Sequence, residues 1–185
     1  NLTVAERSRS VILTNLLDTF EFLTRTGIVL VSGAGNEGNT NIHYEGTFRD
    51  ESSPMDVIIE VGEQKSLLIT ISPNGPGRVN MEVISPSGEL SYNVRYSPDD
   101  PTYKGKFNLE NSFYTIQLIY PWLLSGNEEI VIKIDDIKPG IWTLRVYPEF
   151  LTTGQIDMYL PNGNLIANDT RFLDSNSYAT ITLYG

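Results

Sequence analysis

A glycine-rich loop at residues 33–38 is the segment of this chain best suited to chemistry. Its sequence, Gly33-Ala34-Gly35-Asn36-Glu37-Gly38, directly follows an apolar, β-branched run at residues 28–31. The spacing matches G-x-G-x-x-G, which binds a dinucleotide when a helix opens at the glycines and holds the pyrophosphate. Residues 39–46 are polar and have no helical periodicity. The sequence therefore argues against a dinucleotide site.

Asn36 suggests a different chemistry, that of acyl transfer. An asparagine amide held at the end of a strand can donate a hydrogen bond to the oxyanion that forms when a carbonyl is attacked. Gly33, Gly35 and Gly38 would let the backbone turn sharply and let a substrate approach closely. We take Asn36 as the candidate catalytic residue and the three glycines as its loop. The alternative is that Asn36 only shapes a glycine-rich turn.

Candidate metal ligands are few. His43 is the only histidine, and the chain has no cysteine that could join it, so we expect His43 to be a loop residue. The pairs Asp99-Asp100 and Asp135-Asp136 carry oxygen ligands that suit calcium, but neither has the spacing of a calcium loop. Solvated turn carboxylates are the favoured interpretation. We expect no cofactor, and calcium is the one ion left open.

Aromatic residues raise the alternative of a noncatalytic module that binds carbohydrate or mediates adhesion. Most of them fall in phase with the apolar positions of expected strands, which predicts that they lie in the core; these are Tyr92, Tyr96, Tyr114, Tyr120 and Trp142. Trp122 follows Pro121 in an expected turn. It is the one aromatic candidate for stacking on a sugar.

The composition describes an acidic globular protein. Of 185 residues, 40% are hydrophobic, and the formal net charge is −10. An acidic surface argues against nucleic acid as a partner, because binding the phosphate backbone requires clustered Lys and Arg. No apolar run approaches the length of a membrane span. The absence of cysteine leaves the compartment open.

The pattern of residues 1–49 predicts one helix, one strand and a polar loop. Thr3-x-x-Glu6 has the form of a capping box, and apolar residues then recur at helical spacing between residues 11 and 23. Residues 28–31 have the unbroken apolar character of a strand covered on both faces of a parallel sheet. One helix cannot cover two faces, so we expect the rest of that sheet to lie outside this sequence.

From Met55 onward the pattern is an alternation of apolar and polar residues, with turn clusters rich in Pro, Gly, Asn and Ser between the runs. This pattern is typical of an antiparallel β-sandwich, and among sandwiches we predict a jelly roll. Nine short strands are expected, around residues 57–61, 67–71, 79–83, 92–96, 114–120, 130–134, 142–146, 156–160 and 179–183. The predicted fold class is mainly β: a jelly-roll-like sandwich preceded by a helix and a strand.

The run Gly-Ile-Val-Leu-Val-Ser-Gly-Ala-Gly-Asn-Glu-Gly at residues 27–38, with its preceding helix, resembles the subtilisin-like serine proteases. By that resemblance Asn36 is the oxyanion-hole asparagine. Subtilases carry Asp and His upstream of this residue and Ser downstream in a Gly-Thr-Ser setting. Here His43 follows Asn36, and no Gly-Thr-Ser occurs. The triad is therefore absent from this sequence, and we expect the chain alone to be inactive.

A second resemblance covers most of the remaining chain. A β-sandwich after the oxyanion segment is similar to the inserted jelly roll of the clostridial spore germination proteases, the Csp subtilases. The matching segments are residues 85–89, 138–144, 158–161, 170–173 and 179–183. The resemblance implies a serine endopeptidase as the parent protein, with a protein substrate such as a spore-cortex hydrolase zymogen. It also implies a secreted or spore-associated location in a Gram-positive bacterium.

Together these observations predict an internal fragment of a protease. Residues 1–50 are expected to be a piece of the catalytic domain, and residues 51–185 the inserted sandwich. The expected partners are the remainder of the catalytic domain or its propeptide, with no nucleic acid and no membrane. The apolar face of the expected helix and the strand at 28–31 would otherwise be exposed. We therefore expect either a homodimer through residues 1–50 or a disordered leader.

Overall fold

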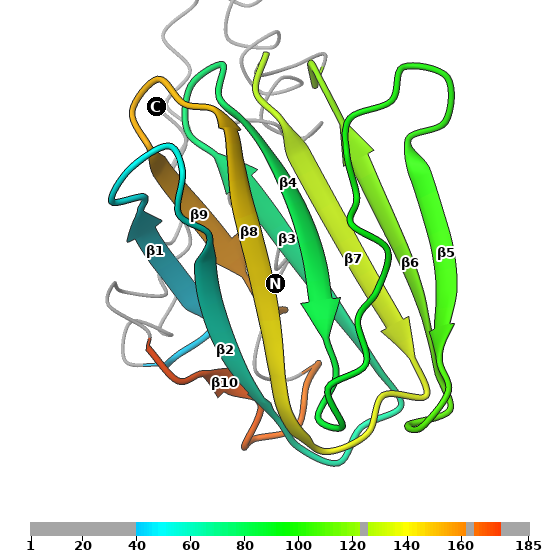
Figure 1. The fold of residues 1–185 in the computed structure, drawn as a ribbon. Coiled ribbons are helices and arrows are strands. Elements are labelled where there is room, and N and C mark those ends of the chain that lie inside the picture. The colour runs from blue at the N-terminus through cyan, green and yellow to red at the C-terminus, as the bar shows by residue number, and fades with distance from the viewer. Residues whose placement is uncertain (1–39, 123–125, 162–164, 175–185) are drawn as a thin grey trace, which may run out of the picture.

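The computed structural model describes residues 40–122, 126–161 and 165–174, which form two antiparallel β-sheets packed face to face (Figure 1). Six strands form one sheet in the order β1-β9-β3-β7-β6-β5, and four form the other in the order β10-β2-β8-β4. Within the described ranges, no helix is long and apolar enough to span a bilayer. The predicted mainly β sandwich is confirmed.

The strand bounds show how the chain alternates between the sheets. They are β1 His43–Thr47, β2 Met55–Val61, β3 Ser66–Pro73, β4 Arg78–Ile84, β5 Thr102–Phe107, β6 Ser112–Ile119, β7 Glu129–Asp135, β8 Gly140–Phe150, β9 Gln155–Tyr159 and β10 Arg171–Phe172. The pairings are nested: β1 pairs with β9, β2 with β8 and β3 with β7. This nesting across two sheets is the jelly-roll-like arrangement expected from the sequence.

The core consists mainly of the apolar residues that recur at every second position of most strands. In the six-stranded sheet, Ile69, Ile116 and Ile132 are almost fully buried, and Ile59 and Leu144 face them from the four-stranded sheet. Side chains alternate between the two faces of a strand, so this spacing places one face of each sheet in the core. The alternation in sequence therefore located seven of the nine expected strands.

Of the other two expected strands, one does not form and one lies outside the described residues. Residues 92–96 do not form a strand; a single bridge joins Val94 to Met81, and the Tyr92 side chain is 63% exposed. Val94 is the one fully buried residue of that run, and Tyr96 is half-buried against the core, because the segment follows the edge of β4 instead of entering a ladder. The strand expected at residues 179–183 lies outside the described residues.

Three strands were missed because their sequences are too polar or too short to alternate clearly. β5 includes Lys104 and Lys106, which point away from the core on an edge strand, and Gly105, over which the Tyr114 phenol lies. Lysine on an edge strand discourages pairing with other molecules. β10 consists of only two residues, Arg171 and Phe172. The third missed strand is β1.

β1 lies upstream of the predicted domain boundary between residues 50 and 51. The segment was expected to be a polar loop, but His43–Thr47 pairs with Gln155–Tyr159 in the six-stranded sheet. Ile42 and Phe48, on either side, are buried in the core. The sandwich therefore includes residues upstream of the predicted boundary. The helix and strand expected within residues 1–39 lie outside the described residues.

Candidate functional site

The predicted oxyanion loop, with Asn36, Gly33, Gly35 and Gly38, lies outside the described residues. The described sandwich begins directly after it, at Thr40. The assignment of Asn36 therefore stays a prediction from sequence. The other candidate residues can be placed.

His43 is a strand residue, in contrast to the loop position expected for it. Its Nε2 lies 2.8 Å from Oδ1 of Asp157 on the neighbouring strand β9, and its ring stacks on Tyr159 with centroids 4.5 Å apart. The nearby hydroxyl of Ser72, which pairs with Asp157 in the sheet, donates instead to Glu129. The His43–Asp157 pair therefore acts as a cross-strand contact of the sheet.

The aspartate pairs belong to turns and strand ends. Asp100 accepts a hydrogen bond from the backbone N–H of Thr102, and Asp135 forms an ion pair with Lys133 on its own strand. Asp136 has φ of 54°, a conformation that Asp and Asn tolerate in turns. Within the described part of the chain, no three His, Cys, Asp or Glu side chains gather in a metal-binding group. The turn interpretation accounts for these carboxylates, and calcium binding stays an untested alternative.

The aromatic residues divide between core and surface. Trp142 is 2% exposed, its ring packs against Phe107, and its Nε1–H donates to the carbonyl of Lys138. Tyr114 is also buried, as predicted, whereas Tyr92 is exposed and was predicted wrongly. Trp122 is half-buried. It adjoins the cis peptide bond between Tyr120 and Pro121, and its backbone N–H donates to Asn127.

Glu128 is a buried carboxyl group that sequence reasoning missed. It is 0% exposed; its Oε2 accepts the backbone N–H of Val79 at 2.7 Å, and its Oε1 is buried without a hydrogen-bond partner. Burial raises the pKa of Glu128 to about 8, assisted by the charge of Glu149 and opposed by the Val79 hydrogen bond and the charge of Arg78. No alternation or motif marks this residue, because its burial arises only when β4 and the start of β7 come together.

Glu110 is a second buried glutamate, but its pKa is lowered where that of Glu128 is raised. Burial by itself would raise its pKa, but hydrogen bonds from Ser87 and Ser85 outweigh that effect, so the pKa is lowered. The Ser87 backbone N–H lies 2.9 Å from Oε1 of Glu110. The number of donors therefore decides the charge state of these two carboxyl groups.

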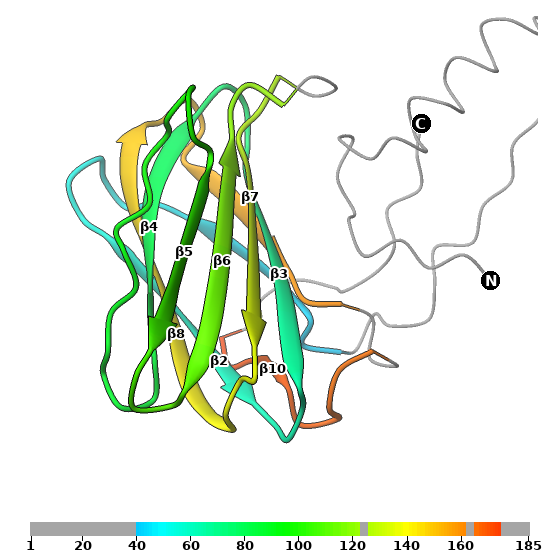
Figure 2. The same ribbon diagram turned by 90° about the vertical axis from the view of Figure 1, so that its right-hand side faces the viewer.

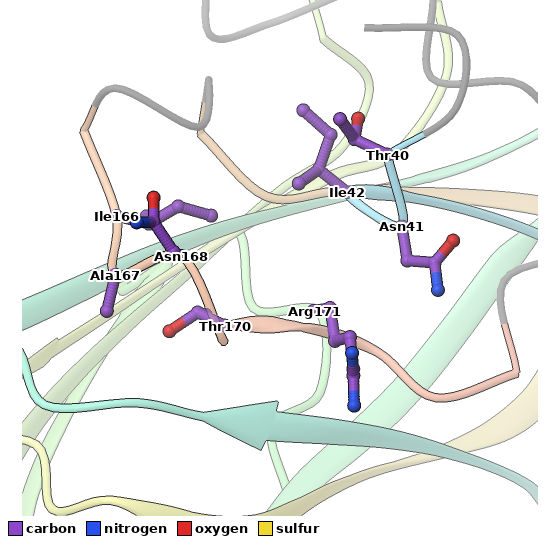
Figure 3. A pocket seen from close by; sticks show the side chains of 8 residues that line it. All are labelled: Thr40, Asn41, Ile42, Ile166, Ala167, Asn168, Thr170 and Arg171. Atoms are coloured by element: carbon purple, nitrogen blue, oxygen red, sulfur yellow. The ribbon is translucent and has the colours of Figure 1, made fainter.

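A cavity of about 290 Å³ lies between the segment that enters the sandwich and the segment before β10 (Figure 3). Its lining residues are Thr40, Asn41, Ile42, Ile166, Ala167, Asn168, Thr170 and Arg171. Arg171 forms an ion pair with Glu60, and Thr170 Oγ1 donates to Gln64. The lining offers amides and hydroxyls but no acid–base pair.

A larger cavity, of about 610 Å³, lies beside the β1–β2 connection. Asp50 contributes to its lining and accepts hydrogen bonds from the backbone and hydroxyl groups of Ser52 and Ser53, which lower the pKa of Asp50 to about 2. This carboxylate holds its own loop in shape. It is therefore a turn residue and not a catalytic acid.

The geometry defines the chain as a two-sheet β-sandwich, and the comparison with solved structures found a protein that contains the same fold. No family model matches the sequence, and no curated protein matches it. Among solved structures, the chain is similar to the CspB protease of Clostridium perfringens, with a TM-score of 0.76 and 23% identity. The match covers 95% of this chain and 36% of that one. The chain thus has the fold of part of a Csp protease and spans about a third of it.

Proposed function

We propose that this chain is part of a subtilisin-like serine endopeptidase of the Csp type. Asn36 donates a hydrogen bond to the oxyanion, and the sandwich is an inserted structural domain. The observation that carries the proposal is the likeness to the CspB protease, which extends over nearly the whole chain. The oxyanion-like run at residues 27–38 supports it independently from sequence.

The chemistry would be shared between this chain and residues that it does not contain. In a Ser-His-Asp protease, Ser attacks the peptide carbonyl, His moves the proton, and the oxyanion hole stabilises the tetrahedral intermediate. This chain would supply only the Asn36 amide donor. Without the triad no tetrahedral intermediate forms, so the chain alone is proposed to be inactive.

The proposed role of the sandwich is to brace the catalytic domain or its propeptide. Its described side chains form a closely packed core and short cross-strand contacts, and the two described cavities lack an acid–base pair. The substrate would be a protein, and a spore-cortex hydrolase zymogen is the proposed substrate. A secreted or spore-associated location would follow from that substrate.

A fluorophosphonate probe, which labels an activated serine, tests the proposal. We expect no labelling of the purified 185-residue chain. If the proposal is right, this chain belongs to a longer polypeptide that contains the nucleophile. That polypeptide should be labelled at a serine downstream of residue 185, and replacing that serine by alanine should abolish labelling. Labelling of the 185-residue chain, or an unlabelled longer polypeptide that cleaves no protein, would contradict the proposal.

A further inference from the structure

Three of the five lysines of the chain lie together on the outer face of the six-stranded sheet. Lys104 and Lys106 belong to the edge strand β5, and Lys133 belongs to β7. Their sequence neighbours Phe107 and Ile132 are buried in the core, so the lysines, at alternate positions, point outward. Figure 2 shows the four-stranded sheet on the opposite side of β5, β6 and β7. All three lysines are exposed to solvent.

The register of β5, β6 and β7 places these side chains in two adjacent rows. Thr115 of β6 lies between Lys104 and Lys133, and in the next row Phe113 lies beside Lys106. Neighbouring strands are about 4.8 Å apart and alternate residues of a strand about 7 Å apart, so the Cα atoms of the three lysines lie within about 12 Å of one another. We call these five residues the basic patch.

The basic patch concentrates positive charge on a protein whose formal net charge is −10. Lys133 is neutralised on its own strand, because its Nζ lies 2.9 Å from a carboxylate oxygen of Asp135. Within the described ranges, neither Lys104 nor Lys106 forms an ion pair, whereas three arginines of the same ranges each contact a carboxylate. The two ammonium groups of β5 are therefore available to an anion from outside the sandwich.

Phe113 adds an exposed aromatic ring to the basic patch. Its side chain is 47% exposed, and Nζ of Lys106 lies 5.2 Å from the centre of its ring. Lysines on an edge strand discourage pairing between sheets, but that role explains neither Lys133, on an interior strand, nor the exposed Phe113. Aromatic residues are enriched in protein interfaces. The combination of charge and aromatic surface therefore suits contact with another polypeptide.

We propose that the basic patch is a docking surface for an extended acidic segment of a partner protein. An extended chain presents alternate side chains on one side about 7 Å apart, which matches the spacing of Lys104 and Lys106 along β5. Charge complementarity would orient such a segment and select against basic partners. Nucleic acid would need a more extensive cluster of cations. The inference does not rest on the proposed protease function.

Fluorescence anisotropy with the full 185-residue chain tests the inference. The probe is a fluorescein-labelled peptide of alternating glutamate and threonine, and its control has glutamine in place of glutamate. We expect Lys104→Gln/Lys106→Gln to weaken binding of the acidic peptide at least about fivefold. The matched control, Arg49→Gln/Lys138→Gln, removes the same charge from exposed positions outside the basic patch and should change binding less than about twofold. Equal losses in the two variants, or equal binding of the two peptides, would overturn the inference.

Amide chemical shifts of the wild-type chain locate the bound peptide without any substitution. We expect the acidic peptide to shift the backbone amides of Lys104, Thr115 and Lys133, and added salt to reverse the shifts, because salt screens exposed charges. A heparin oligosaccharide of equal charge separates a peptide site from a general polyanion site. Shifts that leave the basic patch unchanged, or tighter binding of heparin than of the peptide, would show that the patch is not a docking surface for an acidic polypeptide.

Discussion

Replacing Glu128 by glutamine should make the protein more stable at neutral pH. The Glu128 side chain is fully buried, and its pKa rises from an ordinary value of 4.5 to about 8 in the folded state. Glutamine has the shape of the protonated acid and keeps an oxygen that can accept the Val79 N–H. The substitution therefore removes the ionisation without removing the hydrogen bond.

The sign and the size of the effect follow from proton linkage. Between about pH 4.5 and pH 8 the unfolded chain has released the Glu128 proton while the folded protein retains it. The unfolded state therefore binds fewer protons, and stability falls by about 1.4 kcal/mol per pH unit as pH rises. Over the range from about pH 5 to pH 7.5 this amounts to about 3 kcal/mol, which the Glu128→Gln variant would not lose.

Urea unfolding of the 185-residue chain at several pH values between about 5 and 8 measures this difference. We expect the wild-type and Glu128→Gln proteins to have similar free energies of unfolding near pH 5 and to diverge as pH rises. Glu63→Gln, which changes an exposed glutamate, should follow the wild type throughout. Parallel profiles for Glu128→Gln and wild type would refute the conclusion that Glu128 is protonated in the folded protein.

Three further substitutions test the packing and the charges of the sandwich. Trp142→Ala should lower the free energy of unfolding by about 3–5 kcal/mol, measured by urea denaturation, because it empties a large core site; a loss below about 1 kcal/mol would contradict the described core. Asp56→Asn should cost less than about 1 kcal/mol, because its bidentate contact with Arg145 is largely exposed, and a larger cost would show an unexpectedly strong pair. Glu110→Gln should destabilise the protein at pH 7, and the difference from wild type should shrink as pH falls below 4.5, because the pKa of Glu110 is lowered in the folded state. A difference that grows in acid would contradict the Ser87 hydrogen bond.

The sandwich could be predicted from sequence because most of its strands have one face in the core and one in water. That arrangement produces an alternation such as Ile130, Ile132 and Ile134 in β7. The pattern fails at sheet edges, where β1 and β5 contain outward polar residues and few large apolar ones. It also placed Tyr92 in the core, because periodicity cannot distinguish a strand from a segment that only follows a strand edge.

The buried polar features could not be predicted because each depends on contacts between distant segments. Glu128 gains its hydrogen bond from Val79, and His43 gains its partner from Asp157, which lies 114 residues away in sequence. The sequence analysis did not single out Glu128, and it predicted a loop position for His43. The oxyanion prediction at Asn36 has a different basis, the local resemblance of residues 27–38, and still requires a functional test.

The most direct test of the proposed function is the turnover number of the complete protease with Asn36→Ala, compared with Asn93→Ala as an exposed control. Loss of one oxyanion donor should lower kcat by about 10²- to 10³-fold, with the protein still folded. The Asn93→Ala variant should retain the wild-type kcat. An unchanged kcat in Asn36→Ala would contradict the assignment of this chain as the oxyanion-bearing part of a serine protease.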